Sequence, residues 1–191
     1  LGRPDGFLDR AIAGWTKRGA LVARNAGARA RIAALAEWLQ RQRFAPRAAT
    51  VLHCDFKLDN IILDPDTLAP VALVDWDMGT RGDPLFDLAT LLSYWVEPND
   101  PPALLALRQM PTTKPGFWTR EQAARRYAEL TGCDLTDLPA LRVLALFKLG
   151  IVFLQLHRQW LDGAVSEAVY EGFEAIGEGI LAVAQGATTK L

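Results

Sequence analysis

Apolar side chains recur every three to four residues over most of the chain, a spacing that predicts amphipathic helices. The predicted helices are 5–22, 28–43, 84–95, 103–109, 120–130, 138–161 and 165–185. The segment 138–161 is the most apolar of them, and Pro46 is expected to stop the second helix. The pattern therefore predicts a chain that is mostly helical.

The period changes between residues 50 and 74. The short apolar runs 50–52, 61–63 and 71–74 are too brief for helices and predict strands. The polar segment 64–67 contains Pro65 and predicts a turn that joins the second and third runs into a hairpin. The predicted fold class is therefore α+β, with a helical body around one small β element.

Two helix starts carry capping signals. Asp83 precedes Pro84, which suits an N-cap followed by the first helical position. Thr119 is followed by Glu121 and Gln122, as in a capping box. These two helices are therefore expected to begin at residues 84 and 120.

Composition narrows the class of protein. The 191 residues are 50% hydrophobic and 23% charged, with a formal net charge of −1. This length suits one buried domain or one lobe of a larger protein. The arginines between residues 24 and 47 lie on helical patterns among alanines and are expected on a solvated face. Without a basic stripe, nucleic acid is disfavoured as a partner.

The cysteines and the apolar runs bear on location. Two cysteines, Cys54 and Cys133, do not make a disulfide framework, so a reducing cytoplasm is expected. No apolar run reaches the roughly 20 residues of a membrane span, because Lys148 and Gln155 interrupt the longest one. No signal peptide is visible, and a start at Leu1 suggests a piece of a longer protein.

The candidate chemistry lies in the β region. The run HCDFKLDN at 53–60 is followed by VDWD at 74–77. A carboxylate, an amide and a second carboxylate at this spacing are typical of kinase-type phosphoryl transfer. Asp55 is the candidate base, and Asn60 and Asp75 offer the hard oxygen ligands that Mg²⁺ prefers. Because Asn60 enters the hairpin and Asp75 leaves it, both are expected at the same end.

Other polar residues in these segments have two interpretations each. The Lys57 ammonium could approach the transferring phosphoryl group or lie in solvent. His53 is expected to anchor the loop by hydrogen bonds. Asp87 could face solvent, or it could be buried and accept backbone N–H groups of the loop that carries Asp55. Asp77 could join a second metal site or face solvent.

The acceptor pocket is expected among the helices after residue 90. The candidate contacts are Trp95, Glu97 and Lys148, although core packing is the alternative interpretation for the aromatic residues there. Further aromatic residues of this region are Phe117, Trp118, Phe147 and Trp160. Because a polycationic acceptor would need carboxylates and Glu97 is among few acids here, the composition disfavours such an acceptor.

These residues resemble a known superfamily. The runs at 53–60 and 74–77, together with GDPLFDLA at 82–89, look like the aminoglycoside phosphotransferase and choline kinase-like superfamily. The similarity is greatest to the bacterial branch that is also fused, as a kinase-like part, to some acyl-CoA dehydrogenases. Further matching pieces are SYW at 93–95, PGF at 115–117, RY at 126–127 and LFKL at 146–149.

The resemblance implies an ATP- and Mg²⁺-dependent phosphotransferase that acts on a hydroxyl of a small molecule, such as a hydroxyacyl thioester, an amino alcohol or an aminoglycoside. Asp55 would be the base, Lys57, Asn60 and Asp75 would contact the nucleotide and its metal, and Asp87 would support the catalytic loop. Cys54 stands where the superfamily more often has glycine.

The resemblance also implies a protein-kinase-like C-terminal lobe over 1–191. Its parts would be a helical pair at 1–47, catalytic and metal loops at 48–80, and a helical substrate subdomain at 83–191. The β-rich N-terminal lobe of such proteins is absent, because no strand is predicted before residue 50. The chain alone is therefore expected to bind ATP weakly, and the surface that would meet that lobe could favour self-association.

Two other functions stay open. A kinase-like lobe that no longer catalyses could act as a binding or regulatory module, although such a module has no need of Asp55, Asn60 and Asp75 together. A metal-dependent hydrolase built on the acidic residues would lack the additional His ligands that such sites use.

Overall fold

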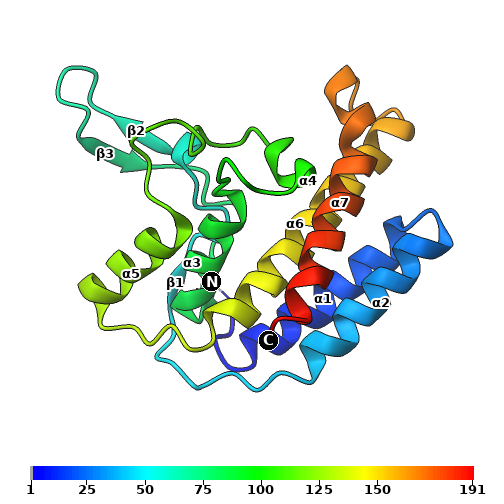
Figure 1. Ribbon diagram of the computed structural model, residues 1–191, viewed down its shortest axis with the longest axis horizontal. Helices are drawn as coiled ribbons and strands as arrows, with labels where there is room; N and C mark the ends of the chain where they lie inside the picture. Colours follow the sequence, from blue (N-terminus) through cyan, green and yellow to red (C-terminus); the bar gives the residue numbers. More distant parts are fainter. Residues whose placement is uncertain (1) are drawn as a thin grey trace.

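The computed structural model describes residues 2–191 as a helical body from which a small β region extends (Figure 1). In chain order the elements are α1 (Phe7–Val22), α2 (Ala26–Gln40), β1 (Thr50–Leu52), η1 (Leu58–Asn60), β2 (Ile61–Leu63), β3 (Pro70–Leu73), β4 (Thr80–Gly82), α3 (Pro84–Tyr94), α4 (Pro102–Leu105), α5 (Arg120–Thr131), α6 (Leu138–Leu161), η2 (Ala168–Gly172) and α7 (Phe173–Thr188). The α+β, mostly helical class predicted from the sequence is confirmed.

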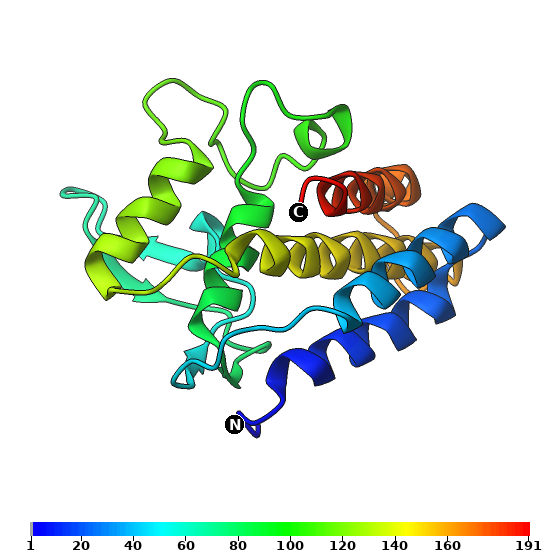
Figure 2. The same cartoon turned by 60° about the horizontal axis from the view of Figure 1, so that its bottom comes forward.

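The core is built around α6. Figure 2 shows this helix between α7 on one side and the α1–α2 pair on the other. Gly150 of α6 faces Gly177 of α7, and a Cβ on Gly177 would lie 2.8 Å from the Gly150 carbonyl oxygen. By length and composition α6 could cross a membrane, but 72% of its most apolar window is buried inside the protein. Its apolar surface is therefore used by the core.

The β region consists of two separate antiparallel pairs. Strand β2 pairs with β3, with Ile61 opposite Leu73, and forms the predicted hairpin. Strand β1 pairs with β4, with Thr50 opposite Gly82. The expectation of a single β element was therefore incomplete, because it did not include β4. Strand β4 has no apolar run of its own and exists because it pairs with β1.

Most helix starts follow the predicted signals. The Asp83 carboxylate accepts a hydrogen bond from Leu85 N at 2.9 Å, and Thr119 and Gln122 form a capping box. Two helix ends were predicted wrongly, since α2 ends before residue 43 and α4 before residue 109.

The last helix begins later than the predicted residue 165. It is preceded by the 3-10 turn η2, whose Tyr170 carbonyl oxygen lies 3.0 Å from His157 Nδ1 of α6. This contact is with the preceding helix, outside the 165–172 segment, whose own sequence does not predict the turn.

One of the arginines expected on a solvated face is largely buried. The Arg47 side chain is 11% exposed and binds Asp83 at 3.0 Å and Asp137 at 2.8 Å. It therefore joins the connection after α2 to the starts of α3 and α6. The expectation failed because periodicity does not reveal ion pairs between distant segments.

Candidate active site

The loop between β1 and η1, residues 53–57, is held in place by Asp87 of α3. Both carboxylate oxygens of Asp87 accept backbone hydrogen bonds, from His53 N at 2.6 Å and from Cys54 N at 2.7 Å. Burial raises the pKa of Asp87, and this effect outweighs the two hydrogen bonds. Of the two interpretations of Asp87, the structure shows the one in which its carboxylate accepts backbone N–H groups of the loop, with a side chain that is half-buried.

The same loop is contacted from α6. The Lys148 ammonium is buried and donates a hydrogen bond to the Cys54 carbonyl oxygen. Cys54 has φ 63°, a left-handed backbone conformation that is uncommon for a residue with a Cβ. Burial raises the pKa of the Cys54 thiol to about 12, so the thiol stays protonated.

The Asp55 carboxylate is bound by two donors. Tyr94 Oη donates to Oδ1 at 2.6 Å, and the Lys57 ammonium donates to Oδ2. Burial raises the pKa of Asp55, but the bonds from Lys57 and Tyr94 outweigh it, so the net pKa is lowered. Asp55 is therefore a carboxylate anion at neutral pH, as a general base must be.

Tyr94 was missed as a site residue by the sequence analysis. It lies seven positions after Asp87 on α3, and residues seven apart in a helix lie on the same face. Asp87 and Tyr94 both contact the loop of Asp55 for this reason. The i, i+7 spacing from Asp87 was the signal that could have revealed it.

Asn60 connects the loop of Asp55 to the segment of Asp75. Its side-chain Nδ2 donates to the backbone carbonyl oxygen of Asp55 at 2.8 Å. The backbone carbonyl oxygen of Asn60 accepts from Val74 N at 2.9 Å. His53 Nε2 lies 2.8 Å from the Val74 carbonyl oxygen, a second link between the two segments. Asn60 is buried and Asp75 is exposed, with φ 62° at Asp75. The hairpin thus brings both predicted metal ligands to one end, beside Asp55.

The donor set fits a magnesium ion. Asn60 Oδ1 takes no hydrogen bond from residues 2–191 and Asp75 offers an exposed carboxylate. Mg²⁺ takes one or two such protein ligands and completes its octahedron with water and phosphate. Within the described chain no group of three or more His, Cys, Asp or Glu side chains could hold a metal ion. A hydrolase-type cage is therefore not supported by these residues.

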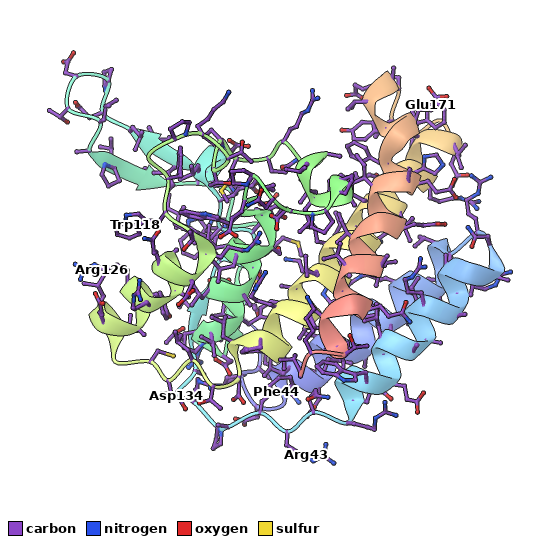
Figure 3. All side chains as sticks on the ribbon, in the orientation of Figure 1. Arg43, Phe44, Trp118, Arg126, Asp134 and Glu171 are labelled. Carbon is purple, nitrogen blue, oxygen red and sulfur yellow. The ribbon has the colours of Figure 1, made fainter. Side chains whose placement is uncertain are left out.

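The three predicted acceptor contacts do not meet in one pocket. Trp95 Nε1 donates to the Trp118 carbonyl oxygen at 2.9 Å, and Glu97 forms an ion pair with Arg120 at 3.1 Å. Figure 3 shows Trp118 close to the start of α5. Lys148 lies beneath the loop of Asp55, as described above. These side chains are occupied by contacts within the protein.

Two neighbouring cavities lie beside the segment that follows α3. One of about 480 Å³ is lined by Asp59, Val96, Arg108 and Lys114, among others. A second of about 380 Å³ shares Lys114 with it and extends past Glu97 and Trp118. Asp59 belongs to η1, so the first cavity reaches the end of the 53–60 segment, although Asp55 itself does not line it.

A larger cavity lies elsewhere. It has a volume of about 570 Å³ and is lined by residues 4–9, 42–47 and 49 together with Gly82 and Asp83. Arg43 and Phe44 of its wall lie on the side of the molecule away from the hairpin tip in Figure 3. None of the predicted site residues lines it.

Comparison with known proteins gives matches of three kinds. The family described as "Phosphotransferase enzyme family" matches residues 1–130. Mouse acyl-CoA dehydrogenase family member 10 is 27% identical over 192 residues, which cover 100% of this chain and 18% of that protein. Mouse acyl-CoA dehydrogenase family member 11 is 29% identical over 164 residues, which cover 83% of this chain and 20% of that protein. The chain thus spans a fifth or less of these relatives.

A solved structure has the same fold. A Ralstonia eutropha protein, provisionally named an aminoglycoside phosphotransferase, superposes with a TM-score of 0.82 at 20% identity, over 99% of this chain and 57% of that one. This likeness confirms the kinase-like fold expected from the sequence.

Proposed function

Because the chain belongs to the phosphotransferase enzyme family, we propose that it transfers the γ-phosphoryl group of ATP to a hydroxyl of a small molecule. Family and fold identify a kinase-like phosphotransferase in general terms. The observation that carries the specific proposal is the Asp55 carboxylate, which is ionised, bound by Tyr94 and Lys57, and linked through its backbone to Asn60.

The residues divide the chemistry between them. Asp55 accepts the proton of the acceptor hydroxyl while the hydroxyl oxygen attacks the γ-phosphorus and ADP leaves. The Lys57 ammonium, next to Asp55, offsets negative charge on the transferring group. Asn60 and Asp75 would hold Mg²⁺, which neutralises phosphate charge when bound. Asp87 keeps the loop in place through the backbone amides of the two residues before Asp55.

The lining of the cavity at the end of the 53–60 segment supports an acceptor that carries an acidic group. Arg108 and Lys114 line the 480 Å³ cavity and form no salt bridge with any other described residue, whereas Asp59 is the one acid in its wall. Two free cations repel a polycationic aminoglycoside and attract carboxylate or phosphate. A hydroxyacyl thioester is consistent with this charge and with the names of the mouse relatives.

We also propose a cytoplasmic protein that acts on small molecules and uses neither nucleic acid nor a membrane. Both cysteines are free, which suits a reducing compartment. The net charge of −1 offers no general attraction for nucleic acid.

The test of the function is the variant Asp55→Asn. In the full-length protein, removal of the base should lower phosphoryl transfer from γ-labelled ATP by about 10²- to 10⁴-fold, while nucleotide binding measured by calorimetry stays unchanged. Asp66→Asn, in the exposed hairpin turn, is the matched control and should keep full activity. Transfer that survives Asp55→Asn would contradict the proposed role of Asp55. A wild-type protein that binds ATP but transfers phosphate to no acceptor would favour the binding-module alternative.

A further inference from the structure

Lys148 is a buried cation that the proposed chemistry does not use. Its residue is 6% exposed and belongs to the most apolar helix of the chain. An ammonium group without compensation is strongly disfavoured in such surroundings. Burial lowers the pKa of Lys148, while Cys54, Asp55 and Asp87 act in the opposite direction. The helix therefore carries this charge at a place where it meets the loop of Asp55.

The bond that Lys148 makes is directed at one peptide group. Its ammonium donates to the Cys54 carbonyl oxygen. That carbonyl belongs to the peptide plane between Cys54 and Asp55, and the orientation of this plane sets the direction in which the Asp55 side chain leaves the backbone. The amide of Cys54 is bound on the other side by Asp87. The buried Lys148 of α6 and the half-buried Asp87 of α3 thus hold Cys54 by both of its backbone groups.

Cys54 needs such support more than a glycine would. Its φ of 63° is left-handed, and a Cβ disfavours that conformation. Glycine adopts it without this penalty. Without Lys148, the Cys54–Asp55 peptide plane would be free to rotate toward a more favourable conformation, and Asp55 would move with it.

We propose that Lys148 is a positioning residue that fixes the Cys54–Asp55 peptide and thereby aims the Asp55 carboxylate at the acceptor. The role of Asp55 in this statement rests on the proposed function. The fixation of the peptide does not, because it follows from the contacts of Lys148 and Cys54 alone. The two parts can therefore be tested separately.

The experiment compares Lys148→Met and Lys148→Gln in the complete protein. Methionine keeps the volume and removes the donor, whereas glutamine keeps a donor and removes the charge. Lys17→Met, on the exposed face of α1, is the matched control. The readouts are kcat, KM for ATP, thermal unfolding, and hydrogen exchange of the backbone amides in a peptide that covers residues 52–58.

Lys148→Met should lower kcat by about 10- to 100-fold with little change in KM for ATP, because the base is misplaced while the nucleotide still binds. Exchange of the 52–58 amides should rise, and Lys148→Gln should recover part of both losses. Adding Cys54→Gly to Lys148→Met should also recover kcat, since glycine stabilises the left-handed conformation without the carbonyl bond. Lys17→Met should match the wild type.

Two results would overturn the proposal. One is a folded Lys148→Met protein with wild-type kcat and wild-type exchange at 52–58. The other is a Cys54→Gly, Lys148→Met protein no better than Lys148→Met, which would make Lys148 a residue of the core only. If Lys148→Met does not fold, the same comparison with Lys148→Gln decides the matter. If the wild type transfers no phosphate at all, the proposed function fails, and hydrogen exchange alone decides whether Lys148 fixes the peptide.

Discussion

The Asp55 carboxylate accepts hydrogen bonds from a phenol hydroxyl on Oδ1 and from an ammonium group on Oδ2. Tyr94 is buried at the end of α3, and burial together with Asp55 raises the pKa of its hydroxyl. The phenol therefore stays protonated and remains a fixed donor to Oδ1. Lys57 is on the loop itself, where a lysine side chain can change partners as charges arrive. For the proposed transfer, Oδ2 is therefore the oxygen that would bind the acceptor hydroxyl once Lys57 has moved.

Tyr94→Phe should lower kcat about 10-fold and leave KM for ATP unchanged. The lost hydrogen bond is made to a charged group, and its absence lets the carboxylate rotate. Steady-state kinetics with saturating acceptor measures the effect. Tyr127→Phe is the matched control, because Tyr127 is half-buried on α5 and its hydroxyl bonds no described side chain. Equal kcat in wild type and Tyr94→Phe would show that the phenol does not orient Asp55.

Among the helices, the contact of α6 with α7 depends on the absence of side chains. A Cβ on Gly150 would lie 2.7 Å from Leu181 Cγ, and one on Gly177 would lie 2.8 Å from the Gly150 carbonyl oxygen. A Cβ at either position would therefore force the two helices apart. The glycines therefore set the distance between α7 and the central helix α6.

Gly177→Ala should lower the free energy of unfolding by about 2 kcal/mol through overpacking. Gly186→Ala on the same helix is the control, because its Cβ would meet nothing within 4 Å. That variant should be neutral or slightly more stable, since alanine favours helix. Denaturant unfolding of both proteins measures the difference. Equal stability of the two variants would refute the close packing.

The start of α5 is attached to the segment after α3 by an ion pair. Arg120 donates to both carboxylate oxygens of Asp100 at 2.6 Å, and the Asp100 side chain is 8% exposed. Burial raises the pKa of Asp100, but Arg120 outweighs it and the net pKa is lowered. The folded protein therefore binds a proton at Asp100 less readily than the unfolded chain does.

Asp100→Asn should lower the free energy of unfolding by about 2 kcal/mol at pH 7. The contribution of the ion pair is fully present above the unfolded pKa, near 3.8, and is lost as the pH falls through the lower folded pKa. The difference between wild type and variant should therefore shrink below that pH. Urea unfolding at several pH values tests this, with Asp66→Asn as control. A difference that is constant down to strongly acidic pH would exclude the linkage.

Local signals predicted the elements well, and distant contacts explain what they missed. Residues close together in the sequence determine the caps at Asp83 and Thr119 and the apolar run of α6. Strand β4 needs β1, and η2 needs a bond to α6. The same distinction holds for the site. The spacing of Asp55, Asn60 and Asp75 lies within one short segment, whereas the places of Tyr94 and Lys148 depend on how helices pack.

The whole molecule has an apolar surface on its β region. The β2–β3 hairpin projects from the helical body in Figure 1. The exposed large hydrophobic residues of this region are Val51, Ile62, Leu63, Leu68, Val71, Val74, Trp76 and Met78. Such a surface favours contact with another apolar surface. We therefore propose that the chain self-associates through this surface of the β region.

Ile62→Lys combined with Val71→Lys should reduce self-association without changing thermal stability. The two residues are 50% and 66% exposed, so charges there stay in water. Sedimentation velocity at increasing protein concentration measures the effect. Leu21→Lys, on an α1 residue that is 75% exposed, should leave association unchanged. A wild type that is monomeric at all concentrations would refute the proposal.

Because α6 carries both the Gly150 contact and Lys148, the interior of the protein and its reactive loop share one rigid support. Loosening that helix would disorder the chemistry at the moment it disorders the core. Activity should then be lost at the same temperature at which the protein unfolds. Substitutions in the core around α6 should change the rate of the reaction as well as the stability of the fold.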